Sequence, residues 1–255
     1  MFFDAHAHLN EGSLGIFVDM ISRSDFGLRI ISNSVDFESS VRNIGLSQRS
    51  ANIIPFIGVH PEIFAVNSEV KPSKSNLDSI NENLIKLVPF CSGIGEIGLD
   101  PKYGSYEEQK YLFQLMLRLS EKTELPVSIH NRDSVPMVLD YLSTFNLRGE
   151  ILLHWFAGSE SELAQIRDRG IFISFGPSLL FSKRIRGILE KTDFDLILSE
   201  TDSPTSFGSI NEGRGSPIQV PSVVFKMCLI KNVRFDYMAD TIEANAHKYL
   251  ERKTH

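Results

Sequence analysis

The chain contains only two cysteines, Cys91 and Cys228, among its 255 residues. Two thiols are too few for a disulfide framework or a cysteine-based zinc site, so both are expected to be small apolar side chains. Long hydrophobic runs are also missing. The longest apolar stretch, IFISFGPSLLF, is short and interrupted by Gly-Pro, which argues against a membrane-spanning helix. The N-terminus lacks the basic and apolar regions of a signal peptide, so we expect a cytoplasmic protein.

An excess of positive charge is absent as well. The formal net charge is -6, with 26 Lys and Arg against 32 Asp and Glu. This balance excludes a protein that coats nucleic acid with a basic surface, so any nucleic acid must be bound locally, at a site. Hydrophobic residues make up 42% and charged residues 23%, which is typical of a globular protein with a packed core.

Short segments rich in β-branched residues or phenylalanine recur along the whole chain. Eight of them are predicted strands: residues 1–6, 28–34, 53–59, 89–97, 126–131, 150–155, 171–176 and 196–201. Helical patterns lie between them, and eight strands that alternate with helices predict a (β/α)8 TIM barrel of the α/β class. Because the chain has neither internal repeats nor a linker, we expect one barrel domain over residues 1–255.

The clearest predicted helix covers residues 107–123, where leucine and methionine recur at helical spacing. Similar patterns cover residues 134–145, 159–170 and 240–253. Two segments, 67–79 and 203–218, are rich in Ser, Pro, Gly and Asn and are predicted to be loops.

The chain begins MFFDAHAHLN, in which His6 and His8 lie two positions apart. Alternate side chains of a strand share a face, so Asp4, His6 and His8 are expected to point the same way. A lone His-x-His is weak evidence for a metal site, because two histidines near a terminus are often unrelated to metal. The metal interpretation therefore depends on further ligands from other strands.

Such ligands stand at the ends of later predicted strands: Glu96, His130, His154 and Asp202. In a barrel, the carboxyl ends of all strands meet at one mouth. His60 also ends a predicted strand, so five of the seven histidines fall at such ends. Taken singly, Glu96 could be a paired core carboxylate and Asp202 a helix N-cap. Taken together, four histidines and two carboxylates predict a site for zinc, manganese or a similar divalent ion.

The sequence resembles the TatD family of metal-dependent deoxyribonucleases, a branch of the amidohydrolase-like barrels. The matching segments are DAHAHL, GVHPE, GIGEIGLD, IHNRDS, LLHWFAGS and SETDSP, in family order between residues 4 and 204. The resemblance implies a (β/α)8 barrel and two divalent ions, either zinc, magnesium or manganese. It also implies hydrolysis of phosphodiester bonds in DNA, as a 3′-to-5′ exonuclease that uses a hydroxide bridging the ions. We expect a monomer whose partner is DNA with single-stranded ends.

Carried over by position, the resemblance implies two ligand sets that share Glu96 as a bridge: His6, His8, Glu96 and Asp202 for one ion, and Glu96, His130 and His154 for the other. It also implies catalytic roles for Glu96 and for Asp202, which is placed to take a proton from the attacking water.

Three residues match substrate-binding positions of the family: His60, Arg132 and Arg214. The guanidinium of Arg132 could bind a phosphate through its planar fork. The alternatives are a surface salt bridge for Arg132 and an ordinary loop histidine for His60. The sequence departs from the family pattern at Pro101-Lys102-Tyr103, where an aromatic pair is usual, and at Asn131, where a cysteine is common.

Ligating histidines usually donate their second ring N–H to a carboxylate or a carbonyl. Asp4, Asp100 and Glu200 are candidates for this outer role, and Asp4 is expected to be hydrogen-bonded because an unpaired buried charge is costly. Trp155 follows His154 at the mouth, where it would either stack on a base or sugar or pack as part of a lid. The basic residues expected near the mouth are Lys102, Lys183, Arg184, Arg186 and Arg214.

Two other functions remain open. The same barrel and metals would serve a C–N or ester hydrolase that acts on a small molecule. Related barrels often bridge their metals with a carbamylated lysine at the end of the fourth strand, and the carboxylate of Glu96 at that position favours the nuclease. A non-catalytic binding or scaffold protein is the third possibility, and the complete ligand set argues against it.

Overall fold

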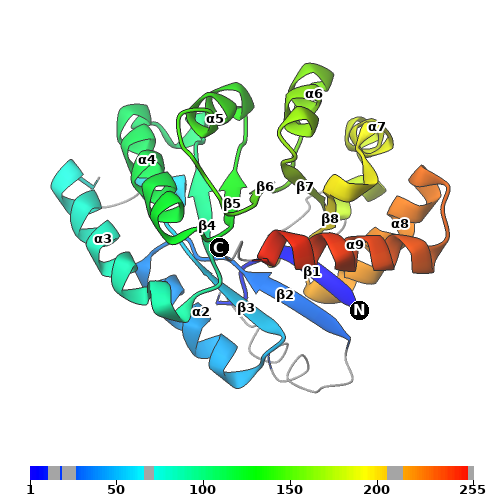
Figure 1. Cartoon of the computed structure of the whole chain (residues 1–255), viewed down its shortest axis with the longest axis horizontal. Helices are drawn as coiled ribbons and strands as arrows, with labels where there is room; N and C mark the ends of the chain where they lie inside the picture. The colour runs from blue at the N-terminus through cyan, green and yellow to red at the C-terminus, as the bar shows by residue number, and fades with distance from the viewer. Residues whose placement is uncertain (11–17, 19–26, 66–71, 206–214, 252–255) are drawn as a thin grey trace.

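The computed structural model of the protein describes residues 1–10, 18, 27–65, 72–205 and 215–251. Each strand pairs in parallel with the next one along the chain, which gives one eight-stranded sheet in sequential order. The strands are β1 Phe2–Ala7, β2 Leu28–Ser32, β3 Ile53–Ile57, β4 Gly93–Gly98, β5 Val127–His130, β6 Ile151–Leu153, β7 Phe172–Phe175 and β8 Ile197–Ser199. All eight predicted strands are present, and the predicted (β/α)8 TIM barrel is confirmed (Figure 1).

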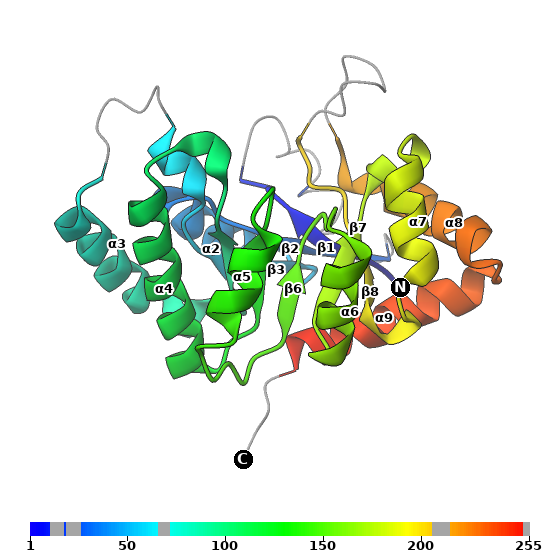
Figure 2. The same cartoon turned by 90° about the horizontal axis from the view of Figure 1, so that it is seen from above.

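Helices follow the strands and cover the outside of the sheet, as Figures 1 and 2 show. They are α2 Phe37–Arg49, α3 Lys74–Leu87, α4 Tyr106–Thr123, α5 Val135–Leu142, α6 Glu160–Asp168, α7 Lys183–Lys191, α8 Val220–Lys231 and α9 Phe235–Leu250. Short 3-10 turns connect some of them: η1 Pro61–Phe64, η2 Val88–Phe90, η3 Pro101–Tyr103, η4 Pro177–Leu180, η5 Phe194–Leu196 and η6 Pro217–Gln219. Among the described residues, no helix is long and apolar enough to cross a membrane.

The loop predicted over residues 67–79 is wrong for its second half, because α3 begins at Lys74. The Ser and Asn residues that suggested a loop form the start of this helix. The Ser73 side chain accepts the Asn76 backbone N–H, and the Asn76 side chain accepts the Ser73 backbone N–H. This reciprocal capping box satisfies two free donors of the first turn. The loop predicted over 203–218 lies partly outside the described residues and ends in the turn η6.

The strands are buried on both faces, as parallel strands under a helical layer must be. Every residue of β4 is buried, including Glu96 near its carboxyl end. Serines occupy part of the narrow interior, for example Ser128 of β5 and Ser174 of β7. Their small polar side chains leave room for the larger histidines and carboxylates above them. The interior therefore changes from apolar packing to a polar cluster toward the carboxyl ends of the strands.

The first and last strands meet through side chains and through the residues after β8. The Thr201 backbone N–H donates to Asp4 Oδ1 over 2.9 Å, and the Ser199 hydroxyl donates to the Phe3 carbonyl over 2.6 Å. Further up, the Asp202 N–H donates to the His6 carbonyl over 2.8 Å. This β1–β8 seam places the two N-terminal histidines directly beside Asp202.

Candidate metal centre

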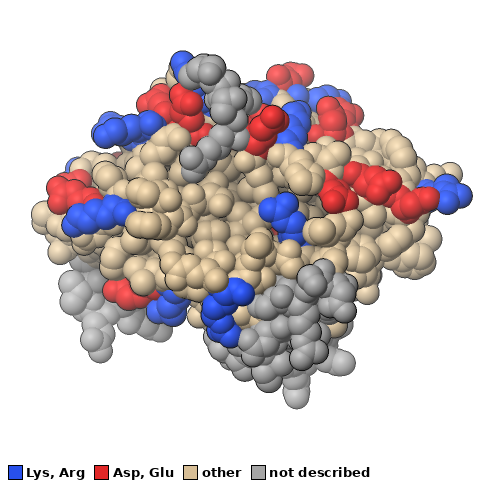
Figure 3. Space-filling view, turned by 60° about the horizontal axis from the view of Figure 1, so that its bottom comes forward, with Lys and Arg blue, Asp and Glu red and all other residues tan. Residues whose placement is uncertain are grey.

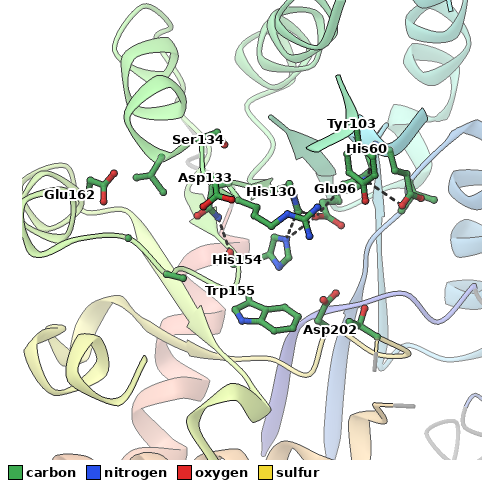
Figure 4. A pocket seen from close by; sticks show the side chains of 18 of the residues that line it. His60, Glu96, Tyr103, His130, Asp133, Ser134, His154, Trp155, Glu162 and Asp202 are labelled. Atoms are coloured by element: carbon green, nitrogen blue, oxygen red, sulfur yellow. Dashed lines mark hydrogen bonds and ion pairs between the residues drawn. The ribbon is translucent and has the colours of Figure 1, made fainter. Parts of the chain in front are cut away.

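A pocket of about 680 Å³ opens at the carboxyl ends of the strands. Five of the six predicted metal ligands line it: His8, Glu96, His130, His154 and Asp202. The sixth, His6, is fully buried and touches the others from below. Figure 4 shows that Glu96, His130, His154 and Asp202 surround the same space, although they come from strands far apart in sequence. The barrel therefore brings together all six residues that the sequence predicted as ligands.

Glu96 lies at the centre of this cluster, and its two carboxylate oxygens face different histidines. Oε1 lies 2.7 Å from His154 Nε2 and 2.8 Å from His130 Nδ1. Oε2 lies 3.2 Å from His6 Nε2 and 3.3 Å from His8 Nε2. A carboxylate in this position can bind one cation with each oxygen.

Asp202 completes the side of the cluster that faces β1. Its Oδ1 lies 3.4 Å from His8 Nε2 and 3.7 Å from His6 Nε2. Its backbone has a positive φ of 50°, which turns the side chain into the pocket just after β8. Three sets of ligand atoms lie within 4.8 Å of one another: His6, His154 and Asp202; His6, His8 and Glu96; His60, Glu96 and His130.

The outer ring nitrogens of the two N-terminal histidines have partners in the barrel wall. His6 Nδ1 lies 2.9 Å from the Ser128 hydroxyl, and His8 Nδ1 lies 3.2 Å from the Asn33 carbonyl. A carbonyl only accepts, so His8 keeps a proton on Nδ1, and Nε2 is the nitrogen that would bind a metal once its own proton is released. This is the arrangement that a metal-ligating histidine requires.

The other two histidines have carboxylates behind them. His130 Nε2 donates to Asp100 Oδ2 over 2.9 Å, and His154 Nδ1 lies 3.7 Å from Glu200 Oε2. The Ser174 hydroxyl donates to the same Glu200 oxygen over 2.7 Å. Asp100 and Glu200 thus lie where the sequence predicted outer partners.

The electrostatics of the cluster favour bound cations. Burial opposes ionisation of Glu96, but its interactions with His60, His154, His6 and His130 outweigh burial and hold the pKa of this carboxyl well below its usual value. Burial also lowers the pKa of His154, yet Glu96 and Glu200 raise it to about 10. A protonated imidazole therefore neutralises the buried carboxylates when no metal is present. A divalent ion would supply the same positive charge and release that proton, so the donor set fits a metal.

The pKa of His6 is shifted in the opposite direction to that of His154, although the two rings stack with 3.7 Å between their centroids. Burial, followed by the charge of His154, lowers the pKa of His6 to about 4. His6 is therefore neutral at pH 7, with a lone pair available for a ligand on the inner nitrogen. At Asp202, burial opposes ionisation, but the hydrogen bond from His8 and the surrounding histidines, His6 and His154, lower its pKa below the ordinary value.

His60 belongs to the same cluster, with Nε2 3.5 Å from Glu96 Oε1. Its Nδ1 accepts the backbone N–H of Glu62 over 3.1 Å at the start of η1. Because Nδ1 accepts this hydrogen bond, the ring carries a proton on Nε2. Its ring packs edge-to-face against His130 and Tyr103, with centroids 4.5 and 5.7 Å away. His60 therefore presents a fixed N–H donor to the pocket.

Arg132 lines the pocket and makes an ion pair with the buried Asp100. Its guanidinium lies over the Tyr103 ring, 5.8 Å from the centroid. The sequence did not single out Tyr103 as a site residue, although its place in the atypical Pro101-Lys102-Tyr103 segment was a signal. Arg184 also lines the pocket and donates to the Ala157 carbonyl. The third predicted substrate contact, Arg214, lies outside the described residues.

Trp155 follows His154 in a left-handed backbone conformation, with φ at 44°. It lines the same pocket as Asp202, and Figure 4 shows its indole on the pocket wall. The position agrees with both roles expected from the sequence, base stacking and lid packing.

Asp4 does not contact a ligand ring. It lies below the cluster, where its Oδ1 accepts the Thr201 backbone N–H and its Oδ2 lies 2.6 Å from the Thr201 hydroxyl. Burial raises the pKa of Asp4 to about 8, against the partial opposition of these hydrogen bonds. The carboxyl is thus hydrogen-bonded, as expected, and is mostly protonated at neutral pH.

This pKa predicts how Asp4 affects stability. Between its ordinary pKa of 3.8 and about 8, the folded protein binds the Asp4 proton and the unfolded chain does not, so this group makes stability fall as pH rises. Asp4→Asn mimics the protonated form and should remove that contribution, which is up to about 1.4 kcal/mol per pH unit. Urea unfolding of both proteins with a chelator, from about pH 5 to about pH 8, measures it. Identical pH dependence of the two would contradict the prediction.

A barrel with histidines and carboxylates at the carboxyl ends of β1, β4, β5, β6 and β8 defines a metal-dependent hydrolase. The family model described as TatD related DNase matches residues 3–251. The chain therefore belongs to the TatD family, as its sequence motifs indicated.

Individual relatives agree with this assignment. A metal-dependent hydrolase of Methanocaldococcus jannaschii is 25% identical over 256 residues, which cover 99% of this chain and 98% of the relative. A deoxyribonuclease of Homo sapiens is 23% identical over 266 residues, which cover 99% and 95% of the two chains. The crystal structure of the TatD homologue YjjV of Escherichia coli matches with a TM-score of 0.86 at 22% identity, over 97% of both chains.

Proposed function

We propose that the protein is a divalent-metal-dependent deoxyribonuclease that removes nucleotides from the 3′ ends of single-stranded DNA. The observation that carries the proposal is the position of Glu96, whose two oxygens face two different pairs of histidines. A site for two adjacent cations bridged by one carboxylate is suited to phosphodiester hydrolysis. The human relative that covers nearly the whole chain is named a deoxyribonuclease, which supports the choice of DNA. In this proposal residues 1–255 act as one domain, in a cytoplasmic monomer.

The proposed ligand sets are those that the resemblance to the family implies. One ion would be held by His6, His8, Glu96 and Asp202, and the other by Glu96, His130 and His154. Zinc, magnesium and manganese all suit nitrogen and carboxylate ligands to some degree, and imidazole-rich sets favour zinc. When bound, such ions supply Lewis acidity to the phosphodiester and lower the pKa of water.

The chain's own residues would perform the remaining tasks. Asp202, ionised at neutral pH, is placed to take a proton from the attacking water. His60 would donate its Nε2 proton in a hydrogen bond to a phosphate oxygen, and Arg132 would bind the phosphate from the rim. Trp155 would stack on the terminal base or sugar. Glu96 is only 3% exposed, so an unpaired strand end can approach it more readily than a rigid duplex can.

Binding of DNA would be local. Figure 3 shows one face of the molecule, on which Lys and Arg are interspersed with Asp and Glu rather than gathered in a basic patch. The net charge of -6 agrees with this view. Affinity for DNA would therefore depend on the few phosphates that enter the pocket and would fall with rising salt.

A second candidate is a C–N or ester hydrolase that acts on a small molecule. It is favoured by the carboxylates of Glu62 and Glu162 in the pocket lining, because they would repel a polyanion. The cluster of metal ligands is equally compatible with this chemistry.

Cleavage of a single-stranded oligonucleotide labelled at its 5′ end distinguishes the two candidates. With zinc, magnesium or manganese we expect a ladder that shortens from the 3′ end, no ladder with excess chelator, and recovery when the ion is returned. A 3′-blocked oligonucleotide should remain intact. A panel of amides and lactones serves as the comparison. No cleavage with any of these ions, together with turnover of an amide or lactone, would transfer the assignment to the second candidate.

A further inference from the structure

We propose that Asp100 is a positioning residue that couples the metal ligand His130 to the phosphate-binding Arg132. The inference rests on the proposed function, because it assumes that Arg132 meets a phosphate. It goes beyond that function in making one buried carboxylate responsible for the geometry of both groups.

The contacts of Asp100 carry this inference. The residue lies just after β4 and is 1% exposed. Its Oδ2 accepts from two donors, His130 Nε2 at 2.9 Å and the Arg132 guanidinium. Its Oδ1 accepts the Lys102 backbone N–H over 2.9 Å. Both oxygens are thus engaged, and the carboxylate has little freedom to rotate away from either partner.

The backbone of Asp100 is held in place as well. Gln109 of α4, which is 1% exposed, accepts the Asp100 N–H with its side-chain oxygen over 2.9 Å. Its amide nitrogen donates to the Asp100 carbonyl over 2.9 Å and to the Gly104 carbonyl over 2.6 Å. The Ser134 hydroxyl donates to the neighbouring Leu99 carbonyl over 2.7 Å. Such a fully bonded buried amide fixes the segment that carries Asp100 against a rigid helix.

At His130, the carboxylate determines which nitrogen faces the metal. Because Nε2–H donates to Asp100, Nδ1 is the nitrogen left to bind a metal, and it lies 2.8 Å from Glu96 Oε1. Outer partners of this kind typically change metal affinity by about 10- to 100-fold.

At Arg132, the same carboxylate holds one edge of the guanidinium while Tyr103 supports its face. The Arg132 side chain is still 45% exposed, so its other edge is available to a ligand in the pocket. A fork held in this way loses less conformational entropy when it binds phosphate than a free arginine would. Asp100 would therefore strengthen phosphate binding, although its own negative charge repels phosphate.

Asp100→Asn tests the inference, because it should weaken phosphate binding even though it removes a negative charge. An asparagine cannot accept on one side from Lys102 and on the other from both His130 and Arg132, since one of its ends is an NH2 group. We expect zinc, titrated by calorimetry into the metal-free protein, to bind about 10- to 100-fold more weakly. At saturating zinc, inorganic phosphate should bind about tenfold more weakly, although loss of a nearby negative charge alone would strengthen its binding.

A double-mutant cycle separates the effect of Asp100 on zinc binding, through His130, from its effect on phosphate binding, through Arg132. Arg132→Met should weaken phosphate binding about tenfold and leave zinc affinity unchanged. In the Arg132→Met background, Asp100→Asn should still weaken zinc binding but should not weaken phosphate binding any further. The matched control is Asp193→Asn, which breaks a 2.6 Å Asp–Arg pair with Arg167 outside the pocket and should change neither affinity.

Three results would overturn the proposal. They are unchanged zinc affinity in Asp100→Asn, stronger phosphate binding in that variant, or an equal loss of phosphate binding with and without Arg132. If Asp100→Asn does not fold, Arg132→Lys tests whether the Asp100–Arg132 contact supports phosphate binding. A single ammonium cannot hold Asp100 and phosphate with the same fork geometry. Wild-type phosphate affinity in Arg132→Lys would contradict the proposal. None of these titrations measures nuclease activity, so failure of the proposed function would be seen separately, in the oligonucleotide assay.

Discussion

Glu96→Gln should lower kcat/KM for single-stranded DNA by about 1,000-fold or more, the scale expected when a shared metal ligand is lost. Glutamine has nearly the same shape, but it is neutral, and one of its two ends is an amide nitrogen that cannot bind a cation. Whichever way the amide turns, either the His130 and His154 side or the His6 and His8 side loses its oxygen. Elemental analysis should show less bound metal per chain.

The matched control for this prediction is Glu62→Gln. Glu62 lines the same pocket, but its carboxylate is 44% exposed and lies 3.5 Å from the outer nitrogen of His60 rather than inside the cluster. Its removal should leave metal content unchanged. Full nuclease activity in Glu96→Gln, at wild-type protein concentration and with the same ions, would show that the bridging role is wrong.

Asp202→Asn should lower kcat by about 100- to 10,000-fold at saturating metal, with a much smaller change in KM, because a general base contributes on this scale. The wild-type carboxyl is ionised at neutral pH, since His8 and His6 outweigh the effect of burial on its pKa. Activity of the wild type should therefore fall as the pH is lowered through the pKa of Asp202, when the base takes up a proton. The asparagine variant should lack that acidic limb.

Asp133→Asn provides the comparison for Asp202→Asn. Both residues have a positive φ, 50° at Asp202 and 51° at Asp133, and asparagine tolerates this conformation as well as aspartate does. Any backbone strain from the substitution is therefore the same at the two positions. If the two variants lose activity equally, or if Asp202→Asn keeps the acidic limb of the pH profile, Asp202 is not the base.

Much of the barrel could be predicted from sequence because its strands are short, largely apolar and buried, and are separated by segments long enough to hold a helix. The helices were harder to predict from the sequence. In α3 only Leu77 and Leu84 are buried, so the helix lacks a recognisable apolar stripe. In α8 the opposite holds, because exposed Phe225 and Leu229 accompany the buried apolar residues and obscure the period.

The clustering of the six predicted ligands could be expected because histidines and carboxylates are rare at the ends of apolar strands. The residues that hold these side chains in place were harder to predict. Gln109 lies within the clearest helical pattern of the chain, where a glutamine is normally a surface residue, and only the fold shows that it is buried and bonded to the Asp100 backbone. The proton position on His60 likewise depends on a backbone N–H that no sequence motif reports.

The β1–β8 seam has a consequence for how the protein is made. During synthesis His6 and His8 leave the ribosome nearly two hundred residues before Thr201 and Asp202, their neighbours across this seam. Until the last strand arrives, the N-terminal strand has no neighbour on one side, and its histidines have only part of their ligand set. Tight metal capture is therefore delayed until the barrel closes, and a chain truncated before β8 should lack it.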